Sequence, residues 1–219
     1  MGRIREYEGE SIVVRYDVRR CIHARECVRG LPDVFDARRR PWVDAAAASA
    51  DRIAETVCRC PTGALSYERA DGGPAEPVPD SNTITVSENG PLYVRGDVEL
   101  TLPDGEVRRE TRMALCRCGK SKNKPYCDDT HYEIGFTAAA SLGDCKLREE
   151  EVEEGTDPQS RLRLSFSPGR SLKVLGPVTI VGGDLEPHEG SRGSLCRCGG
   201  SENKPYCDGT HRHIEFEAE

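Results

Sequence analysis

Three cysteines and one histidine occur twice in this chain in the same register, eighty positions apart. The stretches CRCGKSKNKPYCDDTH and CRCGGSENKPYCDGTH both follow the pattern C-x-C-x2-S-x3-P-x-C-D-[GD]-T-H. Sulfur and imidazole nitrogen are soft or borderline metal ligands, so four of them within sixteen residues indicate a metal centre in each copy. The residues concerned are Cys116, Cys118, Cys127, His131, Cys196, Cys198, Cys207 and His211.

The spacing leaves two kinds of centre open. Structural zinc favours C-x2-C knuckles, whereas here a single residue separates the first two cysteines. Alternate side chains of an extended segment can converge on one iron of a 2Fe-2S cluster, and the third cysteine and the histidine can then bind the other iron. The spacing therefore favours a cluster over zinc, and unliganded cysteines in a loop are the structural alternative.

On these residues the pattern resembles the signature of the CDGSH, or NEET, iron-sulfur family, C-x-C-x2-[ST]-x3-P-x-C-D-G-[SAT]-H. The resemblance implies two 2Fe-2S clusters, each held by the three cysteines and the histidine of one copy. Asp129 departs from the signature, which has glycine at the position that Gly209 occupies. If this position has a positive φ, aspartate is among the better tolerated residues, so we expect an altered environment and a retained cluster.

The other motif residues are predicted to have structural roles. The prolines stiffen the approach to the third cysteine, the serines hydrogen-bond to backbone or sulfur, and the aspartates cap the helix that carries the histidine. These residues are Pro125, Pro205, Ser121, Ser201, Asp128 and Asp208.

A histidine ligand changes the chemistry that such a cluster supplies. Replacing one thiolate by a neutral imidazole makes the cluster less negative and raises its reduction potential relative to an all-cysteine site. A protonated histidine leaves the metal, so acid is expected to loosen the cluster.

The cysteines near the N-terminus follow a different pattern. Bacterial ferredoxins space their ligands C-x2-C-x2-C with a distant C-P, and Cys21, Cys27 and Cys60 match three of these positions, with Ala24 where the second cysteine would be. With RGLPDVFD, RPW and CPTGAL, the segment resembles the divergent mono-cluster ferredoxin family. The resemblance implies a 3Fe-4S cluster on three cysteines, or a 4Fe-4S cluster with one more ligand. The candidates for that ligand are His23 and Cys58.

Other interpretations of these residues stay open. One alternative is that the N-terminal segment has lost its cluster and serves as a docking module. Another is that Cys58 is an incidental helix residue and not a ligand. Cys145 lies outside every pattern and is predicted to be a free thiol, while His188 and His213 are predicted to lie on the surface.

Composition limits the fold and the class of function. Of 219 residues only 36% are hydrophobic and 5% aromatic, which favours several small domains stapled by metals or disulfides over one large core. The N-terminal stretch is charged, and no run of about eighteen apolar residues occurs, so a cytoplasmic protein without membrane spans is expected. There the eleven cysteines indicate metal ligands. With a net charge of -7 and no basic face, nucleic-acid binding is not expected.

The elements that must position these ligands follow from local patterns. A strand is expected over 11–17 and a helix over 45–60, with Ser49 or Asp51 as its cap. Apolar residues at mostly two-residue spacing between Ile84 and Leu102 predict strands and hairpins ahead of the first motif. The domains expected are a divergent mono-cluster ferredoxin-like domain at 1–70, a Gly- and Pro-rich linker at 71–81, CDGSH units at 82–142 and 160–219, and an acidic loop at 143–159.

The segment ahead of each motif is also repeated. GPLYVRGDVEL from Gly90 is aligned with GPVTIVGGDLE from Gly176, so two copies of one β-rich unit are expected. Two such copies can pack as an intramolecular pseudo-dimer in a monomeric chain. The fold class predicted is α+β, a small ferredoxin-like α+β domain followed by this pair.

We identify no catalytic nucleophile, general base or phosphate-binding loop in the sequence. The predicted function is therefore non-enzymatic, electron transfer or transfer of 2Fe-2S clusters, with redox proteins or cluster acceptors as partners. A redox- or pH-sensing regulator and a zinc-stapled interaction module are the alternatives.

Overall fold

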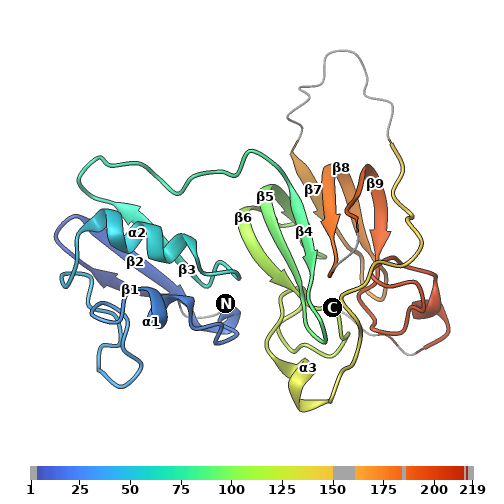
Figure 1. Ribbon diagram of the computed structural model, residues 1–219, viewed down its shortest axis with the longest axis horizontal. Coiled ribbons are helices and arrows are strands. Elements are labelled where there is room, and N and C mark those ends of the chain that lie inside the picture. Colours follow the sequence, from blue (N-terminus) through green and yellow to red (C-terminus); the bar gives the residue numbers. More distant parts are fainter. Residues whose placement is uncertain (1–3, 150–160, 184–185, 215, 217–219) are drawn as a thin grey trace, which may run out of the picture. The chain divides into compact units, whose positions relative to one another are not determined.

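The computed structural model describes residues 4–149, 161–183, 186–214 and 216, and the chain divides into two compact units, Met1–Pro77 and Val78–Glu219 (Figure 1). The division falls within the stretch predicted as a linker, which carries no helix or strand. The chain is β-rich and has few helices. In the described part of the chain, no helix is both long and apolar enough to cross a membrane.

The first unit is a three-stranded antiparallel sheet, in the order β1-β2-β3, with helices packed on it. Ile53 and Val57, one turn apart on α2, are buried in one core with Ile12, Val14 and Leu65 of the sheet. The elements are β1 (Ile4–Glu8), β2 (Ile12–Asp17), the 3-10 turn η1 (Val18–Arg20), α1 (Glu26–Gly30), α2 (Ala50–Cys58) and β3 (Leu65–Arg69). The strand predicted over 11–17 is confirmed as β2, and β1 was not predicted.

Helix α2 is shorter than the predicted helix over 45–60, because the alanine run forms a turn. The Asp44 side chain accepts the Ala46 amide at 3.2 Å and its carbonyl accepts the Ala47 amide at 3.2 Å, which closes this turn before the helix starts. Ser49 occupies the N-cap position, but its side chain makes no capping bond. Asp51 lies in the first turn and pairs with Arg69.

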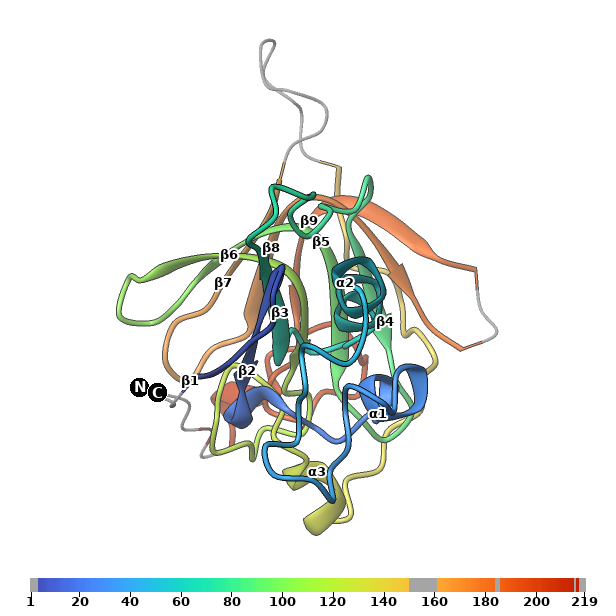
Figure 2. The same cartoon turned by 90° about the vertical axis from the view of Figure 1, so that its left-hand side faces the viewer.

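The second unit contains one six-stranded sheet built from two equivalent sets of strands. Each set supplies a short strand followed by a long hairpin, and the metal-binding motif follows the hairpin. The first set is β4 (Thr83–Val86), β5 (Leu92–Thr101) and β6 (Val107–Leu115), with α3 (Thr130–Glu133) after it; the second is β7 (Leu162–Ser165), β8 (Leu172–Val181) and β9 (His188–Leu195), with the 3-10 turn η2 (Thr210–Arg212). Both motif loops lie at the same end of the strands (Figures 1 and 2).

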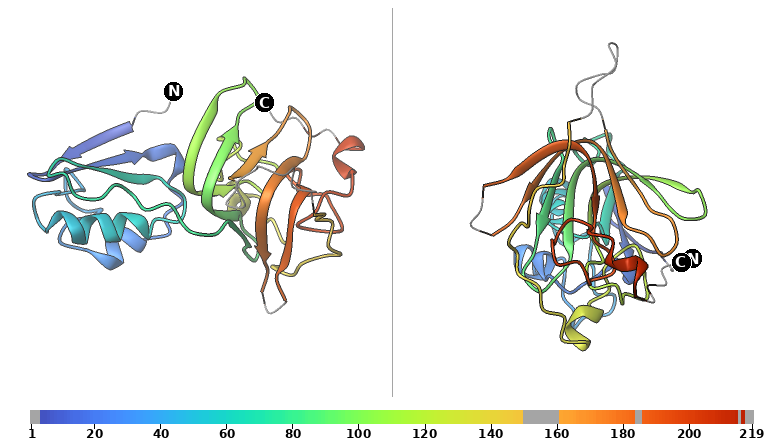
Figure 3. Two further views of the ribbon diagram at one scale, coloured as in Figure 1. Left: turned by 90° about the horizontal axis from the view of Figure 1, so that it is seen from above. Right: turned by 90° about the vertical axis from the view of Figure 1, so that its right-hand side faces the viewer.

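The short strand of each copy bridges the hairpins of the two copies. Strand β4 pairs antiparallel with β5 of its own copy and parallel with β8 of the other, while β7 pairs antiparallel with β8 and parallel with β5. Two further views show these strands side by side (Figure 3). One hydrophobic core contains buried residues of both copies, such as Leu100 and Ile180. The copies are therefore joined by backbone hydrogen bonds between their strands and by one common hydrophobic core.

The register of the repeat differs from the alignment of Gly90 with Gly176. The strand pairing makes Gly96 the counterpart of Gly176, since each lies at an irregularity that divides its long strand into two halves. Both glycines have positive φ, 155° and 105°. A Cβ on Gly96 would lie 2.2 Å from Asn82 Oδ1, and one on Gly176 2.4 Å from the Arg161 carbonyl oxygen. The alignment matched the two GP dipeptides and was therefore wrong. The conformation that requires glycine, a positive φ with close approach of the neighbouring strand, occurs at the bulge glycines.

The predicted acidic loop at 143–159 lies partly outside the described residues, which leave out 150–160. Its described start packs against the second copy. The Asp144 amide donates to Asn203 Oδ1 at 2.6 Å, and the Arg148 amide donates to the Arg192 carbonyl at 2.9 Å. Residues 143–149 are therefore part of the folded unit.

Candidate metal centres

Each motif brings its four predicted ligands together as two pairs. In the first copy Cys116 Sγ lies 3.7 Å from Cys118 Sγ, and Cys127 Sγ lies 3.4 Å from His131 Nδ1. In the second copy the corresponding distances are 3.7 Å and 3.3 Å. The eight predicted residues therefore form two sites of one design, and all come from the loop after a hairpin.

Backbone hydrogen bonds fold each loop back onto the strand that precedes it. The Cys116 amide donates to the Pro125 carbonyl at 2.8 Å, and the Cys127 amide donates to the Ala114 carbonyl at 2.8 Å. The second copy repeats both bonds, at 2.8 Å and 2.9 Å. The first and third cysteines are thus fixed relative to the end of the sheet. In both copies the motif proline follows a cis peptide bond.

The side-chain hydroxyls of the motif serines bind the backbone of their own loop. Ser121 Oγ donates to the Tyr126 carbonyl at 2.7 Å and accepts the Asn123 amide at 3.0 Å. Ser201 makes the same two bonds at 2.7 Å and 3.1 Å. Each serine therefore closes the turn between the second and third cysteines.

The motif aspartates hold the helical turn that carries the histidine. Asp128 accepts the Lys122 amide at 2.7 Å and the Thr130 amide at 3.2 Å. Asp208 makes equivalent bonds at 2.8 Å and 3.0 Å. The prediction that they occupy the cap position is wrong by one residue, because the next residue, Asp129 or Gly209, is the N-cap.

The N-cap residue has a positive φ in both copies, which is the condition under which aspartate was expected to be tolerated. Asp129 lies at φ 69° and Gly209 at φ 95°, the left-handed conformation that suits glycine and tolerates aspartate. The carboxylate of Asp129 also lies among the ligands, since its oxygen, Cys127 Sγ and His131 nitrogen are all within 4.8 Å of one another. The substitution therefore keeps the loop conformation and adds an acidic group to the first site.

Burial controls the protonation of the ligands. Burial raises the pKa of Cys127 to about 12, whereas a hydrogen bond with Cys116 lowers the pKa of Cys118 to about 7. Burial lowers the pKa of His131 and of His211, which favours the neutral imidazole that binds metals. A buried thiol becomes a thiolate at neutral pH when a bound cation offsets the desolvation of its charge.

The surroundings of the two sites differ. His131 is buried, whereas His211 is half-buried. Next to His131, Tyr132 is 75% exposed, and its ring centroid lies 4.1 Å from that of the imidazole. The second copy has the exposed Arg212 at this position. One rim is therefore aromatic and the other is basic.

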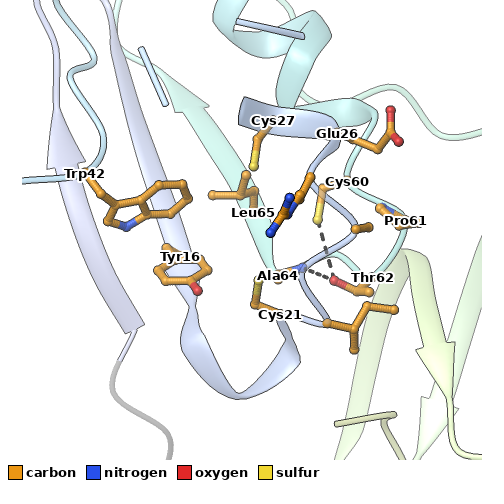
Figure 4. Close-up of a pocket in the computed structure, with 13 residues that line it drawn as sticks. Tyr16, Cys21, Glu26, Cys27, Trp42, Cys60, Pro61, Thr62, Ala64 and Leu65 are labelled. Atoms are coloured by element: carbon orange, nitrogen blue, oxygen red, sulfur yellow. Dashed lines mark hydrogen bonds between the residues drawn. The ribbon is translucent and has the colours of Figure 1, made fainter. Parts of the chain in front are cut away.

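The N-terminal cysteines also converge. Cys21 follows η1, Cys27 lies on α1, Cys60 follows α2, and all three line one pocket (Figure 4). Burial raises the pKa of Cys27 to about 11. Cys60 Sγ lies 3.5 Å from the hydroxyl of Thr62, which also lines the pocket. The pocket therefore brings together the three cysteines that the ferredoxin-type spacing singled out.

The candidates for a further ligand lie elsewhere. Cys58 is the last residue of α2 and His23 is exposed, and neither lines the pocket, whereas Ala24 does. Two aromatic residues also line this pocket, Tyr16 and Trp42, whose ring centroids are 4.9 Å apart. They were not predicted from the sequence. No metal-ligand pattern marks aromatic residues, so only their apolar character was available as a signal.

The residues outside the motifs are placed as follows. Cys145 is exposed, in line with the predicted free thiol, although the Tyr206 hydroxyl lies 3.8 Å from its sulfur. His188, which was predicted to be a surface residue, is half-buried, and its Nδ1 lies 2.7 Å from the Tyr206 hydroxyl. His213 is exposed, as predicted.

Comparison with known families matches both kinds of site. The family described as "Divergent 4Fe-4S mono-cluster" matches residues 7–70. The family described as "Iron-binding zinc finger CDGSH type" matches twice, at residues 89–132 and 170–212. The two CDGSH matches contain every predicted ligand of the two motifs, and the first match contains the three converging cysteines of the N-terminal unit.

Two relatives from Escherichia coli strains, both named "Uncharacterized protein YjdI", are 35% identical to this chain over 66 residues. The match covers 30% of this chain and 87% of the relative. No solved structure matches the chain. The chain is therefore an iron-sulfur protein of the CDGSH family, with two tandem CDGSH domains behind a divergent 4Fe-4S mono-cluster domain.

Proposed function

We propose that each CDGSH domain holds one 2Fe-2S cluster through its three cysteines and its histidine. The observation that carries this proposal is the division of each ligand set into two separate pairs. A cluster with two irons needs two ligands on each iron, which two pairs supply.

A single zinc ion needs a tighter arrangement. Tetrahedral ligands at Zn–S distances of about 2.3 Å lie roughly 3.8 Å from one another, so all four would form one group. Among the described residues, the group of ligand atoms within 4.8 Å of one another is Cys127, Asp129 and His131. Cys116 and Cys118 stand apart from it as a second pair, and the second copy forms no such group. This separation favours the cluster.

In the N-terminal unit we propose a ferredoxin-like α+β fold with a 3Fe-4S or 4Fe-4S cluster on Cys21, Cys27 and Cys60. Support comes from the three thiols that line one pocket and from the match to the divergent 4Fe-4S family. Since neither Cys58 nor His23 lines this pocket, three cysteine ligands fit it best.

The clusters would supply one-electron redox chemistry, and the chain supplies rigid loops, buried thiols and neutral histidines. We propose that the protein transfers electrons or 2Fe-2S clusters without acting as an enzyme. Its partners would be redox proteins or cluster acceptors in the cytoplasm. The reciprocal pairing of β4 with β8 and β7 with β5 supports an intramolecular pseudo-dimer in a monomeric chain.

One observation favours a zinc-stapled interaction module instead. Cys127, Asp129 and His131 alone offer three ligand atoms within 4.8 Å, which suits a single ion. This alternative concerns the first copy, because the second has Gly209 in place of the carboxylate.

The test is a visible spectrum of the anaerobically purified chain before and after dithionite, with iron, zinc and acid-labile sulfide measured on the same sample. About four irons per chain and absorbance that bleaches would support the two 2Fe-2S clusters, and a higher iron content an occupied N-terminal site. A colourless protein that contains zinc would overturn the proposal.

A further inference from the structure

The first metal centre contains an acidic side chain that the second lacks. Asp129 stands at the position of Gly209, between the third cysteine and the histidine of its motif. One carboxylate oxygen of Asp129, Cys127 Sγ and a ring nitrogen of His131 all lie within 4.8 Å of one another. Among the described residues, no other three His, Cys, Asp or Glu side chains are grouped so closely.

The spacing of these three atoms suits ligands of one metal ion. Around a tetrahedral ion, sulfur at about 2.3 Å and nitrogen or oxygen at about 2.1 Å lie roughly 3.6 Å from each other. Cys127 Sγ and His131 Nδ1 are 3.4 Å apart, and the Asp129 oxygen, within 4.8 Å of both ligands, reaches the same spacing by a rotation of its side chain. Carboxylates bind iron beside histidines in other proteins. Asp129 is therefore placed to bind the metal that Cys127 and His131 would hold.

The backbone holds this position in the same way in both copies. The Asp129 carbonyl accepts the Tyr132 amide at 2.9 Å, and the Gly209 carbonyl accepts the Arg212 amide at 2.9 Å. Both Asp129 and Gly209 are N-caps in the left-handed conformation. A Cβ on Gly209 would meet no atom within 4 Å, so an aspartate fits there as well. The second copy therefore provides a matched control for the carboxylate.

Local structure does not account for an aspartate at this position. A residue in the left-handed conformation costs less conformational free energy as glycine than as aspartate. An N-cap aspartate usually offsets such a cost by capping its helix, but the Asp129 side chain makes no capping hydrogen bond. The preceding residue, Asp128, already accepts the amides of Lys122 at 2.7 Å and Thr130 at 3.2 Å. The loop therefore has its amide acceptor without Asp129, whose carboxylate lies beside two ligands.

We propose that Asp129 is a reserve ligand of the first centre, which binds the metal in place of His131 when that histidine leaves it. The inference rests on the proposed 2Fe-2S cluster. In the exchange, the bond from iron to the imidazole nitrogen breaks and a bond from iron to the carboxylate oxygen forms, with no change in the number of electrons. An anionic ligand replaces a neutral one, so the centre gains one negative charge and its reduction potential falls. The second centre has Gly209 at this position and is lost when its histidine leaves.

The first experiment removes each histidine ligand in turn from the full chain. His211→Ala should release the second centre, so that the chain contains about two irons and two sulfides fewer than the wild type. His131→Ala should keep most of the iron of the first centre, at a lower reduction potential than in the wild type. Iron and sulfide analysis, absorbance and a redox titration measure these effects, and circular dichroism shows whether each variant is folded.

Substitutions at the position of Asp129 separate the carboxylate from any other cause. Asp129→Gly added to His131→Ala should release the first centre, so that this double variant loses as much iron as His211→Ala. Gly209→Asp added to His211→Ala should restore iron and sulfide to the second centre. The inference is wrong if His131→Ala loses as much iron as His211→Ala, if the double variant keeps its iron, or if the aspartate transferred to the second copy restores none.

A second measurement keeps both histidines and so covers the case in which the histidine variants do not fold. An excess of an iron chelator withdraws iron from the intact chain, and the decay of the visible absorbance is followed. Since the reserve ligand holds the metal whenever His131 leaves it, Asp129→Gly should speed the loss of one centre by roughly tenfold. Relief of the left-handed conformation alone would slow that loss, so an unchanged or slower decay would overturn the inference.

These outcomes differ from a failure of the proposed function. A wild-type chain that contains zinc and does not bleach with dithionite would overturn the proposed 2Fe-2S clusters, and this inference with them, before any residue is replaced. If the wild-type chain holds the clusters, the variants decide on the reserve ligand alone.

Discussion

At the scale of the residue, Asp129 and Gly209 form a natural comparison, because both occupy the left-handed N-cap of equivalent turns. Asp129→Gly should stabilise the chain by up to about 1 kcal/mol, since glycine adopts positive φ without the steric cost that a Cβ brings. Urea unfolding of the wild type and the variant measures the difference. Gly209→Asp is the control and should cost a similar amount, since a Cβ there meets no atom within 4 Å.

The two histidines predict the pH dependence. Burial lowers the pKa of His131 and His211, so between the lowered values and the ordinary pKa of about 6.5 the unfolded chain binds more protons than the folded one. Stability therefore rises with pH across this interval and is lost as pH falls through it. We expect the visible absorbance to persist above pH of about 6.5 and to decay increasingly fast below it. Decay rates that do not depend on pH would contradict this prediction.

At the scale of the element, the motif loops depend on the aspartate that binds two backbone amides. Asp208→Ala leaves the amides of Glu202 and Thr210 without this acceptor, and because both bonds are exposed to water it should lower the free energy of unfolding by roughly 0.5–1.5 kcal/mol. Asp208→Asn keeps one oxygen acceptor and should cost less. Thermal unfolding and the rate of cluster loss measure both. Equal effects of the two substitutions would mean that the hydrogen bonds are not the cause.

The features that could be predicted from the sequence are those set by residues that are neighbours in the chain. The candidate ligands and the strand β2 follow from residues close together in the chain, and both were predicted, whereas the positive φ at Asp129 was considered only as a condition. The alanine run at 45–49 was predicted to be helical because propensity alone ignores the turn that Asp44 closes. The parallel pairing of β4 with β8 joins segments about a hundred residues apart, and no spacing in the sequence signals it.

At the scale of the whole molecule, the bridging of the two copies by their short strands predicts how a single copy behaves. A fragment of residues 78–149 loses the partners of β4 and β5 in the second copy and half of the shared core. Its exposed strand edges should pair with a second fragment. Light scattering should therefore give a dimer for this fragment and a monomer for residues 78–219. A monomeric, folded fragment would show that the strand pairing between the copies is dispensable.

The two compact units predict independent metal centres. Cys27→Ser should remove the iron of the N-terminal unit, because Cys27 is one of the three cysteines that line its pocket. The core of that unit contains no residue of the CDGSH domains, so their spectrum and potentials should stay unchanged. Iron analysis and a redox titration of this variant provide the measurement, and Cys58→Ser is the control that should keep all its iron. If the Cys58→Ser variant loses iron, Cys58 is a ligand and this prediction is wrong.

The differing rims of the two centres give the fused pair a property that two identical subunits lack. Tyr132 lies exposed beside one histidine ligand, and the exposed Arg212 lies beside the other. Two identical subunits present the same surface to every partner protein, so they cannot distinguish a donor from an acceptor. If the two centres exchange electrons or clusters with partner proteins, as proposed, a single chain with one aromatic and one basic rim would offer those partners two different docking surfaces, which two identical subunits could not do.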